Sequence, residues 1–344
     1  MPSGTVVRRV RSWASAVRRL LDRRAVILSY HRIAEVDCDP WDLAVSPAHF
    51  AEHLEVIRRL GRPISLEGLE RGLRAGEIRR GAVAVTFDDG YADNLLEARP
   101  RLEERGVPAT IFLAAGLLDA AVDFWWERLA ALLLRPGRLP AVLELEIRGR
   151  THRWSVEPEY GTEQARAHRS WRAWQDLAPT DRHRAYRELF GLLRPLGEGR
   201  DAVLAEMSSW AGGARPSGAR PLSRPEAARL GSELIEIGAH TVTHPRLSTL
   251  ARAEKIREIH ESRRALEEIA GRGVTRFAYP YGQPGDYDAE SVAIVREAGF
   301  TLACANVPGA ASRRSDVFGL PRFHVSDWDG DVFEENLGVW LRAA

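Results

Sequence analysis

Short apolar runs alternate with longer amphipathic segments along most of the chain. Runs of the kind that form buried strands cover residues 25–30, 82–87, 109–113, 234–237, 277–279, 301–305 and 318–325. Segments with the apolar period of a helix cover residues 46–61, 93–105, 252–270 and 289–298, and a closing helix starts near residue 332. Strands that alternate with helices in this way predict a parallel sheet covered by helices.

Residues 119–222 interrupt this alternation. They are rich in Trp, Arg and Leu, with an amphipathic run at 124–134, a polar strand-like piece around 143–156 and a return stretch rich in Gly, Pro and Arg at 212–224. A connection this long inside a compact domain is expected to carry structure of its own. We therefore predict an inserted, mainly helical subdomain at residues 119–222.

The overall charge of the chain is close to neutral. Its 344 residues include 49 basic and 48 acidic side chains, which gives a formal net charge of +1 at pH 7. That balance offers no general electrostatic basis for binding nucleic acid. The two cysteines, Cys38 and Cys304, are too few for a disulfide framework. Nothing in the composition indicates an oligomeric state.

The N-terminal segment, residues 1–24, is basic and amphipathic. Arginines interrupt it, so it lacks the continuous apolar core of a secretory signal, and no stretch of the chain is long and apolar enough to cross a bilayer. These features predict a cytoplasmic protein. Residues 5–21 have the pattern of a basic helix that packs on the domain, and the alternative is a helix that lies on a membrane surface.

Two motifs place chemically active side chains directly after apolar strands. The first is Asp88-Asp89-Gly90. Active sites of parallel α/β folds lie at the carboxyl ends of strands. Neighbouring side chains on a strand point to opposite faces, so both carboxylates can serve one site only where the strand ends and the chain turns. Gly90 supplies the conformational freedom for that turn.

The second motif contains His240 and His244, which follow the strand expected at residues 234–237. On a helical turn, two imidazoles four positions apart face the same side and can share a metal ion. One aspartate and two histidines make a 2-His-1-carboxylate set that leaves coordination positions open, as a catalytic metal requires. The other aspartate of the first motif remains available for proton transfer.

Together these motifs resemble those of the polysaccharide deacetylases of carbohydrate esterase family 4, the chitooligosaccharide deacetylase-like group. The matching segments are residues 86–90, 240–245, 27–31, 277–282 and 320–322. The resemblance implies a distorted (β/α) barrel of about seven strands, formed by residues 25–118 and 223–344.

The resemblance also implies roles for individual residues. Asp89, His240 and His244 would hold one divalent metal ion, and Asp88 would be the general base that takes a proton from water. Zinc (Zn2+) is the ion expected with these ligands, which also accept cobalt, nickel or iron (Co2+, Ni2+ or Fe2+). The backbone N–H of Tyr281 would help to hold the developing oxyanion.

Hydrolysis of an amide also needs an acid that protonates the leaving amine. His31 is the candidate, because it lies just past the end of an apolar strand, and His324 is the alternative. The sequence departs from the family pattern at Ala278, where the third motif of the family has an arginine. Arg322, at another strand end, is a candidate replacement.

Trp41 and Trp328 lie in predicted loops and are candidates for lining a substrate cleft, whereas Trp125 and Trp126 fit the buried face of a helix. We interpret the chain as a metal-dependent hydrolase that removes an N-acyl group, most simply N-acetyl, from an amino sugar or another carbohydrate. Two alternatives stay open. One is a deformylase or amidohydrolase acting on a small molecule, and the other is an inactive glycan-binding barrel.

Overall fold

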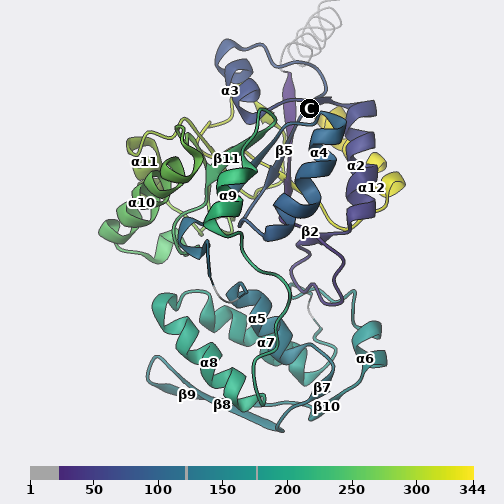
Figure 1. Cartoon of the computed structure of the whole chain (residues 1–344), viewed down its shortest axis with the longest axis vertical. Helices are drawn as coiled ribbons and strands as arrows, with labels where there is room; N and C mark the ends of the chain where they lie inside the picture. The colour runs from purple at the N-terminus through teal and green to yellow at the C-terminus, as the bar shows by residue number, and fades with distance from the viewer. Residues whose placement is uncertain (1–22, 121–122, 176) are drawn as a thin grey trace, which may run out of the picture.

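The computed structural model describes residues 23–120, 123–175 and 177–344, and it shows a barrel-like half above a smaller half (Figure 1). The basic helix expected over residues 5–21 lies outside the described residues. Within the described part of the chain, no helix combines the length and the apolar character needed to cross a bilayer.

A parallel sheet forms the larger half. Its neighbouring strands are, in order, β13 (Leu302–Cys304), β12 (Arg276–Ala278), β11 (Ile235–Ala239), β6 (Ala109–Leu113), β5 (Ala82–Phe87) and β1 (Arg24–Tyr30). Each of these pairs is parallel. Every residue of β5 is buried, as expected for a parallel strand that is covered on both faces.

The segment around Leu320 links the two edges of this sheet. Leu320 forms a parallel bridge with Cys304 of β13, and β15 (Phe323–His324) then pairs in parallel with β1. Seven parallel strands therefore follow one another around a curled, barrel-like sheet, which confirms the fold class expected from the sequence. The strand expected over residues 318–325 is regular only in β15, because Pro321 has no N–H to donate to a ladder.

Short strands extend this arrangement at its margins. β14 (Ala311–Ser312) pairs antiparallel with the start of β1, and β4 (Arg62–Pro63) pairs with β5. β2 (Arg32–Ile33) and β3 (Ala44–Val45) form a separate parallel pair directly after β1.

Helices cover the outside of the sheet. They are α2 (Pro47–Leu60), α3 (Leu66–Ala75), α4 (Arg99–Arg105), α9 (Arg224–Leu230), α10 (Arg252–Ala270), α11 (Ala289–Glu297) and α12 (Gly330–Ala343). In Figure 1, α2, α4 and α12 lie on one flank and α10 and α11 on the other. The sequence analysis did not anticipate α3, although Ser65 caps its first turn and Gly76 ends it in the left-handed region.

One predicted helix is divided in the structure. Residues Asn94–Ala98 form a π-helical turn, and α4 follows it. The Arg99 N–H donates to the carbonyl oxygen of Asn94, five residues back. Pro100, which comes next, has no N–H for a normal helical bond, so a local break at this point is expected.

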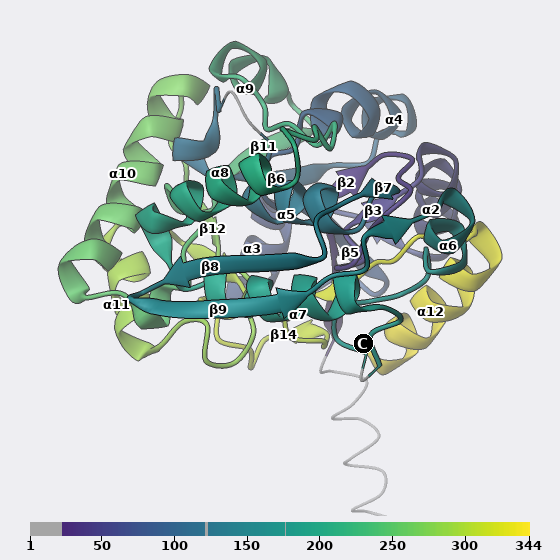
Figure 2. The ribbon, with the colours of Figure 1, turned by 90° about the horizontal axis from the view of Figure 1, so that it is seen from below.

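The smaller half comes from the inserted segment. It contains α5 (Trp125–Leu133), α6 (Thr162–Ala167), α7 (Asp181–Leu193), α8 (Arg200–Trp210), the hairpin of β8 (Val142–Ile147) with β9 (Arg150–Ser155), and the pair of β7 (Gly137–Arg138) with β10 (Glu159–Tyr160). Seen from below, the hairpin crosses the face that points away from the barrel (Figure 2). These elements bury a hydrophobic cluster of their own, to which Trp126, Leu189 and Leu204 belong.

Candidate active site

The candidate catalytic residues gather at the carboxyl end of the sheet. Asp88 and Asp89 directly follow β5, His240 follows β11, and His31 follows β1. Parallel strands bring their carboxyl ends to one edge, so residues far apart in the sequence meet there. This edge faces the inserted segment, whose helices α5 and α7 lie below the barrel (Figure 1).

Four residues of this edge have a left-handed backbone. The φ angle is +75° at Asp89, +67° at Thr241, +56° at His244 and +61° at Tyr281. A non-glycine residue in this region costs roughly 1–3 kcal/mol, so it persists only where the surrounding structure holds it. Such outliers cluster at functional sites, and this edge contains four of the seven found in the described chain.

The two histidines do not lie on a helical turn, so the sequence analysis was wrong on this point. β11 ends at Ala239, and residues 240–246 form an irregular loop. The left-handed Thr241 and His244 turn the chain so that both imidazoles approach Asp89. A loop, rather than a helix, brings the two imidazoles to one site.

Glu258 fixes the conformation of this loop. It is buried on α10, and its Oε2 accepts hydrogen bonds from the N–H groups of Val242 and Thr243 at 2.8 and 2.9 Å. The His244 N–H donates to Thr241 Oγ1 at 3.1 Å. These bonds satisfy the backbone of a strained segment, and they hold the imidazoles in place through contacts that involve no ligand.

Asp89, His240 and His244 form a buried set of groups of the kinds that bind metal ions. Their ligand atoms lie within 4.8 Å of one another, and Asp89 Oδ1 is 3.4 Å from His240 Nε2 and 3.2 Å from His244 Nε2. His240 Nδ1 donates to the carbonyl oxygen of Ala278 at 2.7 Å, so in the neutral ring Nε2 presents a lone pair on the side of Asp89. The set therefore fits one divalent cation with three protein ligands.

Electrostatics favour an ionised carboxylate in this set. Burial acts to raise the pKa of Asp89, but the contacts with His240 and His244 outweigh it and hold that pKa well below its usual range. Burial also disfavours a charged His240, yet the hydrogen bond to Asp89 and the two carboxylate charges raise its pKa. Metal ligands have to be deprotonated, and Asp89 meets this condition at neutral pH.

Asp88 is oriented by a buried arginine. Arg322 Nη1 and Nη2 donate to the two carboxylate oxygens of Asp88 at 2.8 and 2.6 Å. Arg322 is 0% exposed, and its remaining donors reach Thr86 Oγ1 at 3.1 Å and the Ala305 carbonyl at 2.9 Å. Burial acts to raise the pKa of Asp88, but Arg322 outweighs it and lowers that pKa. The carboxylate of Asp88 thus has a buried guanidinium as its partner.

These residues line a cavity of about 470 Å³. Its polar lining includes His31, Asp88, Asp89, Arg194, His240, His244, Tyr281 and His324, and its apolar lining is Trp41, Leu43, Trp126, Trp174, Phe190 and Pro308. A larger cavity of about 890 Å³ is lined by Arg32 and Glu127 among others, but none of the metal-binding residues borders it. We take the smaller cavity as the active site because it contains the groups that can carry out chemistry.

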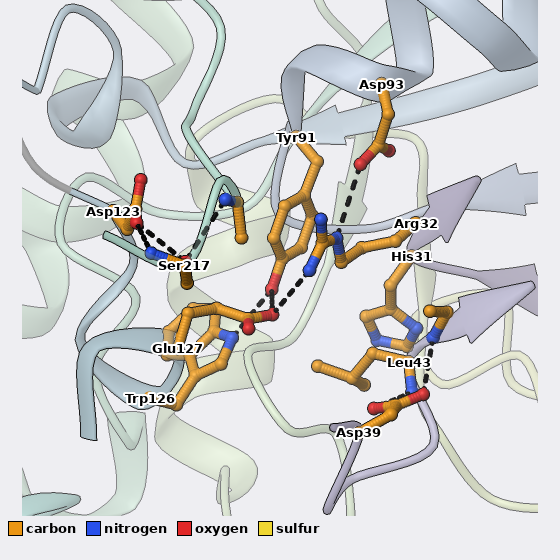
Figure 3. A network of polar contacts seen from close by, with 12 residues as sticks. His31, Arg32, Asp39, Leu43, Tyr91, Asp93, Asp123, Trp126, Glu127 and Ser217 are labelled. Carbon is orange, nitrogen blue, oxygen red and sulfur yellow. Dashed lines mark hydrogen bonds and ion pairs between the residues drawn. The ribbon is translucent and has the colours of Figure 1, made fainter. Parts of the chain in front are cut away.

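A polar network joins the inserted segment to the barrel beside this cavity (Figure 3). The Trp126 ring packs against His244 with centroids 5.1 Å apart, and its indole N–H donates to Tyr91 Oη at 2.7 Å. Tyr91 donates to Glu127 at 3.1 Å, and Arg32 pairs with Glu127 at 3.3 Å. Burial raises the pKa of Glu127 to about 7, although Arg32 opposes the shift. Helix α5 is thereby linked to a metal-binding histidine.

The turn that carries Tyr281 is also held from the inserted segment. Arg194, just after α7, has its guanidinium carbon 3.9 Å from the centroid of the Tyr281 ring, and it pairs with Asp286 of the same turn. Tyr281 packs edge-on against His244, with ring centroids 4.7 Å apart. Among the described residues, the Tyr281 backbone N–H has no hydrogen-bond partner.

Both candidate acids line the cavity, with ring centroids 5.7 Å apart. Burial lowers the pKa of His31 to about 4, although Asp89 and Asp88 favour its protonated form. His31 Nδ1 is buried and has no partner within the described chain. His324 differs, because its Nε2 donates to the Asp42 carbonyl at 2.7 Å.

The structure separates the two candidate substrate-binding tryptophans. Trp41 lines the cavity and packs against Phe190, with ring centroids 4.2 Å apart. Trp328 is not part of the cavity lining. It packs near Trp340 with ring centroids 6.1 Å apart, and its carbonyl accepts a hydrogen bond from His53 at 2.7 Å.

The sequence analysis missed most of the wall that the inserted segment contributes. Trp126 was interpreted as a core residue, yet it is both buried and part of the cavity lining. Trp174, Phe190 and Arg194 had no recognisable signal, because each is an isolated side chain in a segment outside the motifs.

A family model and a curated relative match parts of the chain. A family model described as polysaccharide deacetylase matches residues 75–157 and 208–303, just over half of the chain. YxkH of Bacillus subtilis, which is grouped by name with the polysaccharide deacetylases, is 28% identical over 92 residues. That segment is 27% of this chain and 32% of YxkH, so the match spans about a third of the curated relative.

Solved structures share the fold. The Streptococcus pyogenes deacetylase PplD, in complex with acetate, gives a TM-score of 0.57 at 17% identity and covers 93% of this chain and 99% of that chain. IcaB from Ammonifex degensii gives 0.56 at 20% identity, covering 93% and 98%. A de-N-acetylase from Aggregatibacter actinomycetemcomitans gives 0.55 at 13% identity, covering 91% and 99%. Because the family model matches more than half of the residues of this chain, the chain belongs to the polysaccharide deacetylase family.

Proposed function

We propose that the chain is a metal-dependent hydrolase that removes an N-acyl group, most simply N-acetyl, from an amino sugar of a glycan. The observation that supports this most directly is the placement of Asp88, oriented by Arg322, beside the set of Asp89, His240 and His244 in one cavity. PplD and the de-N-acetylase from Aggregatibacter actinomycetemcomitans, which share this fold, are named for this activity.

Asp89, His240 and His244 would hold the cation, with Zn2+ as the ion that suits one carboxylate and two imidazoles. When bound, a divalent cation would supply Lewis acidity for the acyl oxygen and would lower the pKa of a water molecule. The hydrogen bond from His240 to the Ala278 carbonyl would keep that ring in the tautomer that can bind metal.

Asp88 would act as the general base. Its two oxygens are fixed by Arg322, and its lowered pKa keeps it ionised at neutral pH, so it can accept the proton of the attacking water. The unpartnered N–H of Tyr281 would hold the developing oxyanion, since a donor that is already in place stabilises charge without reorganisation.

His31 would protonate the leaving nitrogen. With a pKa of about 4 it is neutral at neutral pH, so it has to gain a proton during the reaction. Asp88, which takes a proton from water in the same cavity, is the group that can supply it. His324 is less suited to the role, because its Nε2 is already bonded to the Asp42 carbonyl.

A release assay tests the proposal. The metal-loaded protein is incubated with N-acetylated amino sugars, their oligomers and small N-formyl and N-acetyl amides, and free acetate and formate are measured. Release of acetate from sugars is expected. Release of acyl groups only from small amides would instead support a deformylase or amidohydrolase, and release from no substrate would favour a glycan-binding barrel without turnover.

The matched variant is Asp88→Asn, whose folding is checked by circular dichroism. It should bind the metal and lose turnover, because the amide keeps the shape of the side chain but cannot accept a proton. Turnover close to that of the parent would show that Asp88 is not the base.

The acid is tested by changing the leaving group. His31→Ala should lower kcat on an amide by roughly 10²–10⁴, the usual contribution of general acid catalysis, and should hydrolyse an activated ester almost as well as the parent. His324→Ala should show neither effect. The opposite pattern would assign the acid to His324.

A further inference from the structure

The wall of the catalytic cavity contains several aromatic rings, of which one group lies around Trp41 and another ring lies beside His244. Trp174 lies 6.3 Å from Trp41 and Trp41 lies 4.2 Å from Phe190, measured between ring centroids. Deeper in the cavity, the Trp126 ring lies 5.1 Å from the ring of His244. The rings of Trp174, Phe190 and Trp126 belong to the inserted segment. The ring of His244 belongs to the loop of residues 240–246, and Trp41 lies in a loop of the barrel.

Trp174 differs from the other rings because it is exposed. It lines the cavity while 58% of its surface remains accessible, whereas Trp126 is buried. It is the one aromatic among the large hydrophobic side chains that are exposed in the described chain. Because this ring lines the same cavity as Asp88 and Asp89, its accessible surface is open to a ligand that binds there.

The backbone just before Trp174 is held by polar contacts, although the ring is exposed. The Ala173 N–H donates to the Pro40 carbonyl at 2.8 Å, and Arg172 pairs with Asp42 at 2.9 Å. These contacts tie the segment to the loop that carries Trp41. A backbone that is held in this way places the ring at the cavity wall before a ligand binds, which lowers the entropy cost of binding.

We propose that Trp174, with Trp41 behind it, forms a binding subsite for the apolar C–H face of a pyranose ring next to the ring that loses its acyl group. This inference rests on the proposed function and extends it to substrate class. A flat aromatic surface with few polar groups suits the apolar face of a sugar. The rim position assigns this subsite to a second ring, so the enzyme is expected to prefer oligosaccharides over a monosaccharide.

Binding is measured first, with a ligand that the enzyme cannot turn over. The metal-loaded parent and its Trp174→Ala, Trp174→Phe and Leu177→Ala variants are titrated by calorimetry with the fully deacetylated β-1,4-linked glucosamine tetramer. Leu177 is the control, because it is 84% exposed, close in sequence and absent from the cavity lining. Trp174→Ala should weaken binding about tenfold, Trp174→Phe should retain most of it, and Leu177→Ala should have no effect.

Turnover is measured next, with N-acetylglucosamine, its β-1,4-linked tetramer and its octyl glycoside. In Trp174→Ala, the preference for the tetramer over the monosaccharide, measured as the ratio of kcat/KM values, should fall about tenfold. An effect confined to the octyl glycoside would assign the ring to an apolar aglycone and overturn the proposal.

Failure of this subsite can be told apart from failure of the proposed function. If the parent releases no acetate but Trp174→Ala still weakens tetramer binding, the subsite stands and the catalytic proposal fails. If the parent releases acetate but Trp174→Ala and Leu177→Ala bind and turn over the tetramer equally well, the catalytic proposal stands and the subsite is wrong. Absence of tetramer binding to the parent would also overturn the subsite.

Discussion

Replacing Arg322 by methionine should destabilise the protein in a way that depends on Asp88. Arg322 is 0% exposed, and two of its nitrogens bind both oxygens of Asp88. Methionine keeps an apolar side chain of similar length but leaves the carboxylate of Asp88 buried and unpaired. Breaking a buried ion pair on one side costs about 3–5 kcal/mol of unfolding free energy.

A double-mutant cycle separates this electrostatic cost from lost packing. Arg322→Met removes the same packing whether residue 88 is charged or not, but it strands a charge only when Asp88 is present. In the Asp88→Asn background, Arg322→Met should therefore cost about 2 kcal/mol less than in the parent.

Unfolding in urea, followed by circular dichroism, measures the four proteins. Chelator is present throughout, because a bound metal would add its own binding free energy to the stability of the folded state. Equal costs of Arg322→Met in both backgrounds, within about 0.5 kcal/mol, would refute the reasoning and show that the pair contributes no coupling. If Arg322→Met costs the parent less than about 1 kcal/mol of unfolding free energy, then leaving Asp88 buried without Arg322 does not destabilise the protein as expected.

Three further predictions follow from the site and its surroundings. Metal analysis should find about one divalent ion per chain, and the ion should be lost in His240→Ala but kept in the exposed control His260→Ala. Retention of the ion in both variants would contradict the metal site. Arg194→Ala should lower kcat about tenfold with little change in KM, because it releases the turn that holds Tyr281 in its left-handed conformation. A kcat within about twofold of the parent would count against a role of Arg194 in positioning Tyr281. Burial lowers the pKa of His53 to about 4, so as the pH falls below 6.5 the unfolded chain binds a proton at this residue before the folded protein does. The free energy of unfolding in urea should therefore fall by about 2 kcal/mol between pH 7 and 5 because of His53, and His53→Gln should lack this loss. If the difference in unfolding free energy between the parent and His53→Gln stays constant over these pH values, His53 is not the source of the loss.

The sequence predicted the strands well where apolar runs end sharply. β5 covers residues 82–87, as expected, and Asp88 follows it directly, because a fully buried parallel strand needs an unbroken apolar run. The convergence of His240 and His244 was predicted for the wrong reason. Threonine and histidine carry no signal for a left-handed backbone, which here depends on contacts with Glu258 from a distant helix.

Contacts over long sequence separations account for most of what remained unpredicted. Arg322 was a candidate only by its position at a strand end, and its bond to Asp88 spans 234 residues. The aromatic wall could not be inferred, since nothing in the sequence of Trp174 or Phe190 indicates which face of the inserted segment turns toward the barrel. Such placements depend on tertiary packing, which local patterns do not encode.

The segment that links the two edges of the barrel also has a consequence for protein synthesis. Leu320 and β15 complete the ring of strands, and Arg322 between them supplies the only guanidinium that contacts Asp88 in the described chain. A chain still emerging from the ribosome lacks these residues even when the two carboxylates and both metal-binding histidines have already been made. Asp88 is then neither oriented nor paired, and the sheet has an open edge. A chain that stops before Arg322 would therefore leave the buried Asp88 carboxylate without its partner.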